Sequence, residues 1–416
     1  MNGFSIVFVL ALAATTATRL WLAFRHVRHV QAHRERVPEA FAADIDLEAH
    51  RKAADYTSAK TRLSAAAIAF DAAVLLALTF GGILQWLDGL AAALFQNDIL
   101  RGTAFVALLV VLTSMLELPF GLYRTFVIET RFGFNKMTLG MWIADLVKHA
   151  AVGAVLGLPL VLAVLWLMER MGELWWFYVW LVWIGFSTLL LAVYPAFIAP
   201  LFNRFSPMQE GETKRRIEKL IERCGFTSKG LFVMDGSKRS THGNAYFTGF
   251  GKSKRIVFFD TLLNRLEAPE IEAVLAHELG HFRRRHVFKR LAWTFAASLV
   301  LLAVLGALMD QPWFFVGLGV AYPATDAMAL ALFFLVVPVF VFPLQPLMAM
   351  YSRKHEFEAD EYAAQYTPAR DLIRALVKLY KDNASTLTPD PLHSAWYDSH
   401  PPAATRILRL QQMAQA

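Results

Sequence analysis

Seven long apolar stretches run through this sequence, and they constrain its fold more than any other feature. A helix needs about 20 apolar residues to cross the roughly 30 Å hydrocarbon core of a bilayer. Hydrophobic residues make up 56% of the chain and charged residues only 18%, which is too little charge for an ordinary soluble protein. The sequence therefore predicts a mainly helical, multi-pass membrane protein with the lipid bilayer as its solvent. The expected spans are 3–24, 64–86, 102–123, 149–168, 174–198, 290–310 and 327–350.

Charge and cysteine usage argue against other classes of protein. The net charge is +7, but no basic stretch is interleaved with aromatic residues on a soluble module, so nucleic acid is not an expected partner. The single cysteine, Cys224, excludes an intramolecular disulfide and a Cys-rich metal cluster. Arg19, Asp71 and Glu117 lie inside apolar stretches, where ionisable groups are costly and usually face protein or water. A hydrated chamber between the helices would explain them, as would pairing between helices.

Basic residues gather in the loops on one side of the predicted spans. They follow the first and third spans, whereas the loops after the second, fourth and sixth are short and nearly neutral or acidic. Because cytoplasmic loops carry the excess of Lys and Arg, we expect the N-terminus outside the cell and the C-terminus inside. The first span lacks a basic segment before it and is expected to be a retained anchor, not a signal peptide. Loop composition and short termini favour a bacterial inner membrane.

Two segments are too polar to lie in a membrane, and both fall on the cytoplasmic side by the span count. Residues 201–289 contain a polar helical pattern near 212–220 and two strand-like runs at 230–234 and 254–259. Residues 351–416 are polar and rich in helical patterns. We therefore expect an N-terminal membrane domain (1–200), a cytoplasmic segment (201–289), a transmembrane hairpin (290–350) and a C-terminal cytoplasmic segment (351–416).

The run 277–281, HELGH, carries the strongest chemical signal in the sequence. Histidines four residues apart share one face of a helix, so His277 and His281 can bind one metal ion. Glu278 faces the space beside that ion, where an attacking water would lie. The structural alternative is a helix with two surface histidines and a glutamate. The motif favours a zinc hydrolase in which Glu278 is the general base.

A catalytic zinc ion needs a third protein ligand, and the last polar segment offers candidates. Glu356 and Asp360 share a helical face, so one can bind the metal while the other orients a ligand histidine. His355 is a rival ligand, one residue off that face. Glu358 lies on the opposite face and is expected to be solvated. His286 follows three arginines and is expected to be a surface or interface histidine.

Taken together, these motifs resemble those of the Ste24-type CAAX prenyl proteases, the integral-membrane zinc proteases of family M48. The resemblance rests on HELGH, on Ser352-Arg353 with Glu356 and Ala359-Asp360, and on Ser399-His400-Pro401-Pro402 with Arg406-Ile407. Further matches lie in the family's order at 131–136, 194–203 and 242–246. The resemblance implies seven transmembrane helices around a large chamber, capped by a gluzincin-like zinc protease domain with a small β-sheet.

The resemblance also implies the roles of individual residues. One zinc ion would be held by His277, His281 and Glu356, and Glu278 would act first as general base and then as general acid. Asn244, Ala245 and Tyr246 would bind the substrate backbone as an added strand. His400 and Arg406 would help to bind the substrate or to stabilise the oxyanion. His400 also fits a turn histidine that caps a helix. In eukaryotic relatives the substrate is a prenylated C-terminal Cys-a-a-X sequence.

Three alternatives remain beside this interpretation. A seven-span transporter would place its polar groups at mid-membrane, whereas this His/Glu cluster lies in a polar segment. A catalytically silent scaffold would lack a ligand or Glu278, and none is missing. A smaller heat-shock-type protease of the same clan would be shorter, with fewer spans. The substrate stays open between prenylated CAAX-type peptides and other membrane proteins handled in quality control, because bacteria are generally not thought to prenylate their own proteins.

Overall fold

The computed structural model describes residues 2–228, 230–248 and 255–415. Within this part of the chain, seven helical segments are long and apolar enough to cross a membrane, which confirms the predicted fold class. They are α1 (Gly3–Ala32), α2 (Leu47–Leu78), α4 with the π-helical turn η2 (Asp98–Glu129), α5 (Leu139–Arg170), the segment around α6 (Gly172–Phe202), α11 (His286–Leu308) and α13 with α14 (Asp326–Tyr366).

The first two helices differ from the predicted spans. With 30 and 32 residues, α1 and α2 are longer than a bilayer requires. A 32-residue helix is about 48 Å long, so their basic ends, near Arg28 and Arg51, can extend into water. The predicted second span, 64–86, is wrong at its end: α2 stops at Leu78, and α3 (Ile83–Leu94) is a separate helix. Gly82 lies between them at φ 74°, a backbone conformation that breaks the helix.

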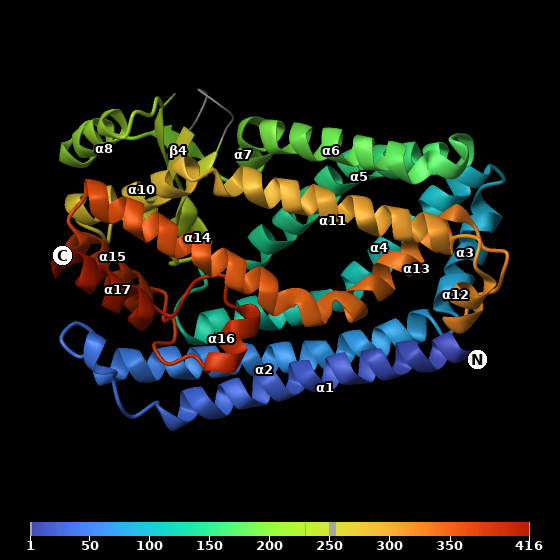
Figure 1. The fold of residues 1–416 in the computed structure, drawn as a ribbon, viewed down its shortest axis with the longest axis horizontal. Helices are drawn as coiled ribbons and strands as arrows, with labels where there is room; N and C mark the ends of the chain where they lie inside the picture. Colours follow the sequence, from blue (N-terminus) through green and yellow to red (C-terminus); the bar gives the residue numbers. More distant parts are fainter. Residues whose placement is uncertain (1, 229, 249–254, 416) are drawn as a thin grey trace.

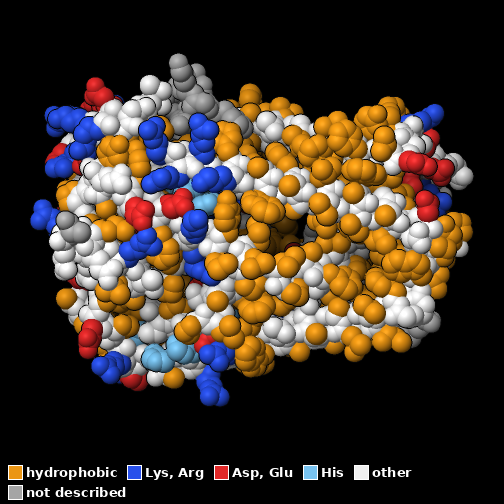
Figure 2. Space-filling view, viewed as in Figure 1, with side chains coloured by type: hydrophobic (Ala, Val, Ile, Leu, Met, Phe, Trp, Pro, Cys, Tyr) orange, Lys and Arg blue, Asp and Glu red, His pale blue; other side chains and the backbone are white. Residues whose placement is uncertain are grey.

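The spanning helices leave a space between them. In the most apolar 18-residue stretch of each helix, none of the residues of Gly172–Phe202 are buried. The buried share is 11% in α2, in α4 and in α11. A helix in a packed bundle buries one face, so these helices are open on both sides. Figure 2 shows an opening in the apolar surface between them. Asp71 and Glu117, whose charges predicted a chamber, are both exposed.

A packed core closes the bundle at the end that carries the N-terminus (Figure 1). There Phe8 of α1, Leu84 of α3, Phe105 of α4 and Leu332 of α13 are fully buried. The short helix α12 (Pro312–Gly317) adds Phe315 to this core. The membrane domain is therefore closed at one end, and the other end meets the polar part of the chain.

The polar part contains a small sheet of four strands in its described residues, in the order β1-β2-β4-β3. The predicted strands at 230–234 and 254–259 are confirmed as β2 (Leu231–Met234) and β4 (Arg255–Phe259), although residue 254 lies outside the described residues. β2 and β4 are parallel, whereas β1 (Phe205–Pro207) and β3 (Ala245–Thr248) pair antiparallel with their neighbours. β3 is thus an edge strand.

Helices cover this sheet and join the two polar segments at the end that carries the C-terminus (Figure 1). One apolar core includes Ile217 of α8, Phe258 of β4, Leu275 of α10, Ala363 of α14 and Leu372 of α15. The helices of this core are α8 (Glu212–Arg223), α9 (Asp260–Leu263), α10 (Ala268–Arg283), α14 (Gln345–Tyr366), α15 (Ala369–Asp382) and α17 (Ala403–Gln415). The short helix α7 (Ala199–Phe202) precedes β1, and α16 (Pro391–Tyr397) packs on α14 and α1. Segments on either side of the α11–α13 hairpin therefore form one unit.

Candidate active site

Helix α10 carries the HELGH run, as its periodicity predicts. Its start is fixed by Pro269 in the first turn and by a capping box between Glu267 and Glu270. Glu270 is fully buried and forms an ion pair at 2.7 Å with Lys378 of α15. The helix is thereby held on α15, with His277 buried and His281 partly exposed on the face toward α14.

α14 crosses α10 at Gly280, and the crossing is unusually close. A Cβ atom on Gly280 would lie 2.9 Å from the Cα of Ala359 and 3.1 Å from its carbonyl oxygen. Ala359 itself has no exposed surface. Two small residues are therefore needed here, and their contact brings Glu356, one turn earlier on α14, against the two histidines of α10.

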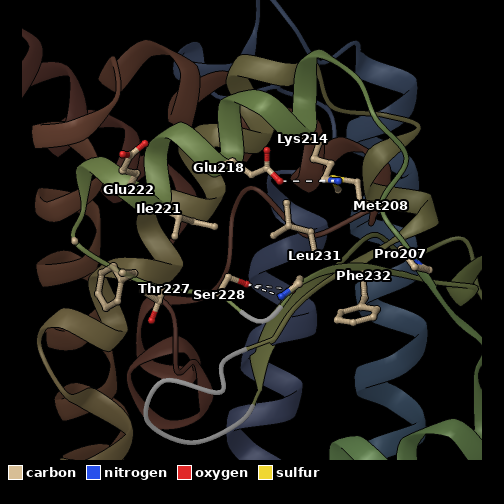
Figure 3. A pocket seen from close by; sticks show the side chains of 13 residues that line it. Pro207, Met208, Lys214, Glu218, Ile221, Glu222, Thr227, Ser228, Leu231 and Phe232 are labelled. Atoms are coloured by element: carbon tan, nitrogen blue, oxygen red, sulfur yellow. Dashed lines mark hydrogen bonds and ion pairs between the residues drawn. The ribbon is translucent and has the colours of Figure 1, made fainter.

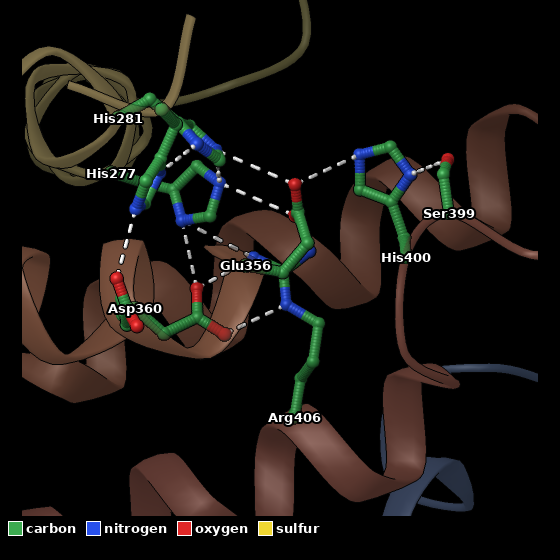
Figure 4. Close-up of polar contacts among 9 residues, drawn as sticks. His277, His281, Glu356, Asp360, Ser399, His400 and Arg406 are labelled. Carbon is green, nitrogen blue, oxygen red and sulfur yellow. Dashed lines mark hydrogen bonds and ion pairs between the residues drawn. The ribbon is translucent and has the colours of Figure 1, made fainter. Parts of the chain in front are cut away.

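Three potential metal donors meet at this crossing (Figure 4). Nε2 of His277 lies 3.2 Å from Nε2 of His281, and these atoms lie 3.5 and 3.4 Å from the Glu356 carboxylate. All three donor atoms lie within 4.8 Å of one another. The buried Oε2 of Glu356 makes no short hydrogen bond to a described residue: its neighbours are Nε2 of His277 at 3.5 Å and Nη1 of Arg406 at 3.7 Å, so a bound cation would complete its contacts. Two imidazoles and one carboxylate are a donor set typical of catalytic zinc, so the residues fit this ion.

A carboxylate and a guanidinium hold the His277 ring in place on its Nδ1 side. Nδ1 of His277 lies 2.8 Å from Asp360, so a proton on Nδ1 leaves Nε2 free to bind a metal. Arg406 of α17 donates to both oxygens of Asp360, at 2.8 and 2.6 Å, and is itself buried. The structure thus places Arg406 against Asp360, and its predicted role in substrate binding stays a prediction.

Electrostatics distinguish the titratable groups of α10. Burial lowers the pKa of His277, but hydrogen bonds to Asp360 and Glu356 outweigh it and raise the pKa to about 9. Burial, and next the neighbouring His277, lower the pKa of His281 to about 3. Burial raises the pKa of the Glu278 carboxyl group. A carboxylate whose pKa is raised toward neutrality is suited to both accepting and donating a proton.

A cavity of about 590 Å³ joins these groups to the predicted substrate-binding residues. Glu278, His400, Asn244 and Ala245 all line it, together with the metal donors His277 and Glu356 and with Arg406. Nε2 of His400 lies 3.5 Å from Glu356, and its side chain is 62% exposed. Tyr246 is not among the lining residues; its ring packs against Phe259 and its hydroxyl lies 3.9 Å from the sulfur of Met234.

The open edge of β3 borders this cavity. The carbonyl oxygen of Asn244 accepts a hydrogen bond from the Phe259 amide at 3.0 Å. Because hydrogen-bonded and non-hydrogen-bonded pairs alternate in an antiparallel ladder, the N–H and C=O of Ala245 point away from β4. The Ala245 amide donates to the side-chain oxygen of its neighbour Asn244, at 2.8 Å. An extended peptide could therefore pair with β3 at Ala245, on the side where Glu278 lies.

A second cavity, of about 760 Å³, lies between α8 and the paired strands β1 and β2 (Figure 3). Lys214, Glu218 and Ile221 of α8 and Leu231 and Phe232 of β2 line it. Its described lining includes none of the metal donors or predicted substrate-binding residues. The smaller cavity is therefore the candidate active site.

The structure shows which of the open alternatives hold for three neighbouring residues. His355, the rival ligand, stacks on His286 with ring centroids 3.9 Å apart, and the metal cluster contains Glu356 instead. His286, expected to be a surface or interface histidine, lies at an interface: only 4% of it is exposed, and it contacts His281 of α10 and Glu358 of α14. Glu358 is not simply solvated, because its Oε2 lies 3.0 Å from His286. Sequence spacing could not reveal these contacts, which depend on how α11 and α14 meet.

Replacing Gly280 with alanine should separate α10 from α14. Overpacking of a tight contact costs about 1–3 kcal/mol, and the shift should weaken the metal site because its ligands lie on both helices. We expect a lower Tm and a higher zinc dissociation constant in the purified protein. Gly157→Ala is the matched control, since a Cβ at that helical glycine meets nothing within 4 Å. Equal Tm and zinc affinity in both variants would contradict the close crossing.

Comparisons with known proteins cover nearly the whole chain. Residues 26–204 match the family model described as CAAX prenyl protease N-terminal, five membrane helices, and residues 207–414 match peptidase family M48. The chain is 37% identical over 351 residues to the CAAX prenyl protease 1 homolog of Arabidopsis thaliana, covering 80% of each chain. It is 30% identical to CAAX prenyl protease 1 of Saccharomyces cerevisiae, covering 100% of this chain and 95% of the relative. The crystal structure of S. mikatae Ste24p superposes with a TM-score of 0.92 at 30% identity, over 99% of both chains.

Proposed function

The chain belongs to peptidase family M48, as a membrane metalloprotease of the CAAX prenyl protease family, and on that premise we propose a zinc-dependent mechanism for it. The resemblance of its motifs to that family is confirmed. In the proposed mechanism one zinc ion is held by His277, His281 and Glu356. One observation carries the proposal: these three donors meet beside a cavity, and the open edge of β3 borders the same cavity.

The residues around the cavity have separate roles in the proposed hydrolysis. When bound, zinc supplies Lewis acidity that polarises the scissile carbonyl group and acidifies the attacking water. Glu278 accepts a proton as the water oxygen attacks the carbonyl carbon. It then gives that proton to the amine nitrogen when the C–N bond breaks. His400, at the exposed rim, donates a hydrogen bond to the oxygen that becomes negative. Asp360 and Arg406 keep His277 oriented.

The substrate is held by its backbone and by apolar contacts. Main-chain pairing with Ala245 fixes an extended peptide without regard to its sequence, which is the logic of strand addition. Opposite β3, α15 contributes Leu372, Leu376 and Leu379 to the cavity wall. These side chains would favour aliphatic residues next to the scissile bond. We propose a prenylated CAAX-type peptide as the substrate, with its lipid in the apolar membrane domain.

A farnesylated CAAX peptide and the same peptide without the lipid test this substrate. We expect kcat/KM to be at least about tenfold higher for the farnesylated peptide, because each buried CH₂ group contributes about 0.8 kcal/mol. Cleavage should stop when zinc is removed by a chelator and return when zinc is restored. Equal kcat/KM for the two peptides would contradict the preference for prenylated substrates and favour a role in membrane-protein quality control.

The membrane orientation is also proposed. On the face shown in Figure 2, Lys and Arg side chains gather at the end of the molecule that holds the polar part, and few lie at the opposite end. Because cytoplasmic loops carry the excess of Lys and Arg, this distribution of basic residues supports a cytoplasmic active site and an N-terminus outside the cell. A bacterial inner membrane stays a prediction from loop composition, whereas the relatives reported above are eukaryotic.

The remaining expectations fit this proposal without being tested. The division at 200, 289 and 350 stays a prediction; the two matching family models meet between residues 204 and 207. A transporter or a silent scaffold gains no support, because His277 and His281 lie outside the seven spanning segments, Glu356 lies near the polar end of the last one, and Glu278 lines the same cavity. The proposed partners are a peptide or membrane-protein substrate and the lipid bilayer, not nucleic acid.

A further inference from the structure

We propose that His286 and Glu358 form a hydrogen-bonded relay that positions the metal ligand His281. This inference rests on the proposed zinc site. Nδ1 of His281 lies 2.9 Å from Nδ1 of His286, and Nε2 of His286 lies 3.0 Å from Oε2 of Glu358. The relay thus runs from the metal ligand through a second imidazole to a carboxylate.

With zinc bound at Nε2 of His281, one arrangement of protons on the two neutral histidines satisfies both contacts of the relay. His281 turns Nε2 toward His277 and Glu356, so its remaining proton belongs on Nδ1. His281 then donates to Nδ1 of His286, which must be unprotonated. The proton of His286 therefore lies on Nε2 and is donated to Glu358. A carboxylate at the end of such a chain fixes the ring orientation and makes the ligand nitrogen more basic.

The local backbone brings the two histidines together. α10 ends at Arg283 and α11 begins at His286, with only two residues between them. Arg285 between them has φ 56° and ψ 35°, a left-handed conformation that is uncommon for a residue with a side chain. This break between the helices places His286, five residues after His281, against the end of the metal-binding helix.

α14 then fixes the ring of His286. His355 stacks on it with an interplanar angle of 10°, and Tyr351 contacts the His355 ring at 4.3 Å between centroids. His286 is buried, so its Nδ1 and Nε2 depend on these protein partners. α14 therefore supplies three carboxylates to the site: Glu356 directly, Asp360 through His277, and Glu358 through His286.

The two histidine ligands are supported differently. His277 contacts the Asp360 carboxylate directly, and Arg406 holds that carboxylate in place. On the Nδ1 side of its ring, His281 is linked to a carboxylate through His286. Because His286 also begins α11, the relay connects the metal ligand to the first turn of a membrane helix. His286 is thus a positioning residue: it acts through His281 and does not touch the substrate.

Substitutions that separate hydrogen bonding from packing test the relay. His286→Phe keeps a ring to stack on His355 but cannot accept the His281 proton. Glu358→Leu removes the final acceptor, whereas Glu358→Gln keeps an oxygen that can accept from His286. His355→Phe is the packing control. Each full-length protein is purified in detergent, and its zinc dissociation constant is measured by competition with a chelator, alongside kcat/KM and Tm.

Loss of a partner that orients a metal ligand typically weakens binding about 10- to 100-fold, and we expect this range for His286→Phe. Glu358→Leu should weaken zinc binding about tenfold, while Glu358→Gln and His355→Phe stay within about threefold of wild type. Zinc affinity of His286→Phe within about threefold of wild type would overturn the relay, as would equal weakening by His355→Phe. If His286→Phe does not fold, the comparison of Glu358→Leu with Glu358→Gln tests the relay instead. Zinc affinities of these two variants within about threefold of each other would then overturn it. Failure of the wild type to bind zinc would instead refute the proposed function.

Discussion

Glu278→Gln should lower kcat for peptide cleavage on the order of 10³- to 10⁴-fold while the protein still binds one zinc ion. Glutamine has nearly the same shape as glutamate but cannot accept the proton of the attacking water. The metal donors of His277, His281 and Glu356 do not include this side chain, so the metal site should stay intact. Cleavage of a farnesylated CAAX peptide and the zinc content of the same preparation measure both expectations.

Glu272→Gln provides a control on the same helix. Glu272 forms ion pairs with Arg223 at 2.9 Å and with Arg216 at 3.3 Å, away from the cavity. Ion pairs of this kind are worth about 0–1 kcal/mol, so the variant should keep both its rate and its zinc. If Glu278→Gln cleaved the peptide as fast as wild type, another group would have to accept the proton.

Glu356→Ala should abolish stable zinc binding and with it the activity. Removing the third donor leaves two imidazoles, which do not complete the three-ligand set of a catalytic zinc site. Zinc contributes several kcal/mol to stabilising the transition state, so we expect the rate to fall at least about 10³-fold. The measurement is zinc per chain after dialysis against a weak chelator, together with kcat/KM.

The comparison for this variant is Glu361→Ala, on the same helix. Glu361 forms an ion pair with Arg409, is partly exposed, and does not line the cavity. This variant should keep one zinc ion and nearly full activity. A Glu356→Ala protein that kept one tightly bound zinc ion would show that the third ligand lies elsewhere.

Periodicity explains how much of the fold and the site could be predicted. Apolar runs of bilayer length identified all seven spans, because a membrane helix must be apolar along its whole length. The 3.6-residue period placed His277 and His281 on one face, and it did the same for Glu356 and Asp360 on their own helix. These features are local, and a single sequence carries them directly.

Contacts across helices were the part that could not be predicted. Periodicity shows which face a residue occupies but not what lies opposite, so Arg406 was not expected to bind Asp360. His286 and Glu358 meet only because Arg285 takes a left-handed conformation and α14 passes beside it. The close contact of Gly280 with Ala359 is likewise a property of the pair of helices.

The metal site depends on this assembly. Two donors come from α10 and one from α14, and the whole α11–α13 hairpin separates them in sequence. The close contact of Gly280 with Ala359 holds α10 against α14, and the ion pair of Glu270 with Lys378 holds α10 on α15. A change at the crossing can therefore reduce metal affinity without altering any ligand.

Titration of the metal-depleted protein with zinc tests the central claim most directly. The full-length chain is treated with a chelator in detergent, and zinc is returned in steps below one equivalent while cleavage of a farnesylated CAAX peptide is followed. We predict that cleavage rises in proportion to zinc, saturates at one ion per chain, and stays absent in Glu356→Ala throughout. Full cleavage by the metal-depleted wild type would contradict a zinc site formed by His277, His281 and Glu356.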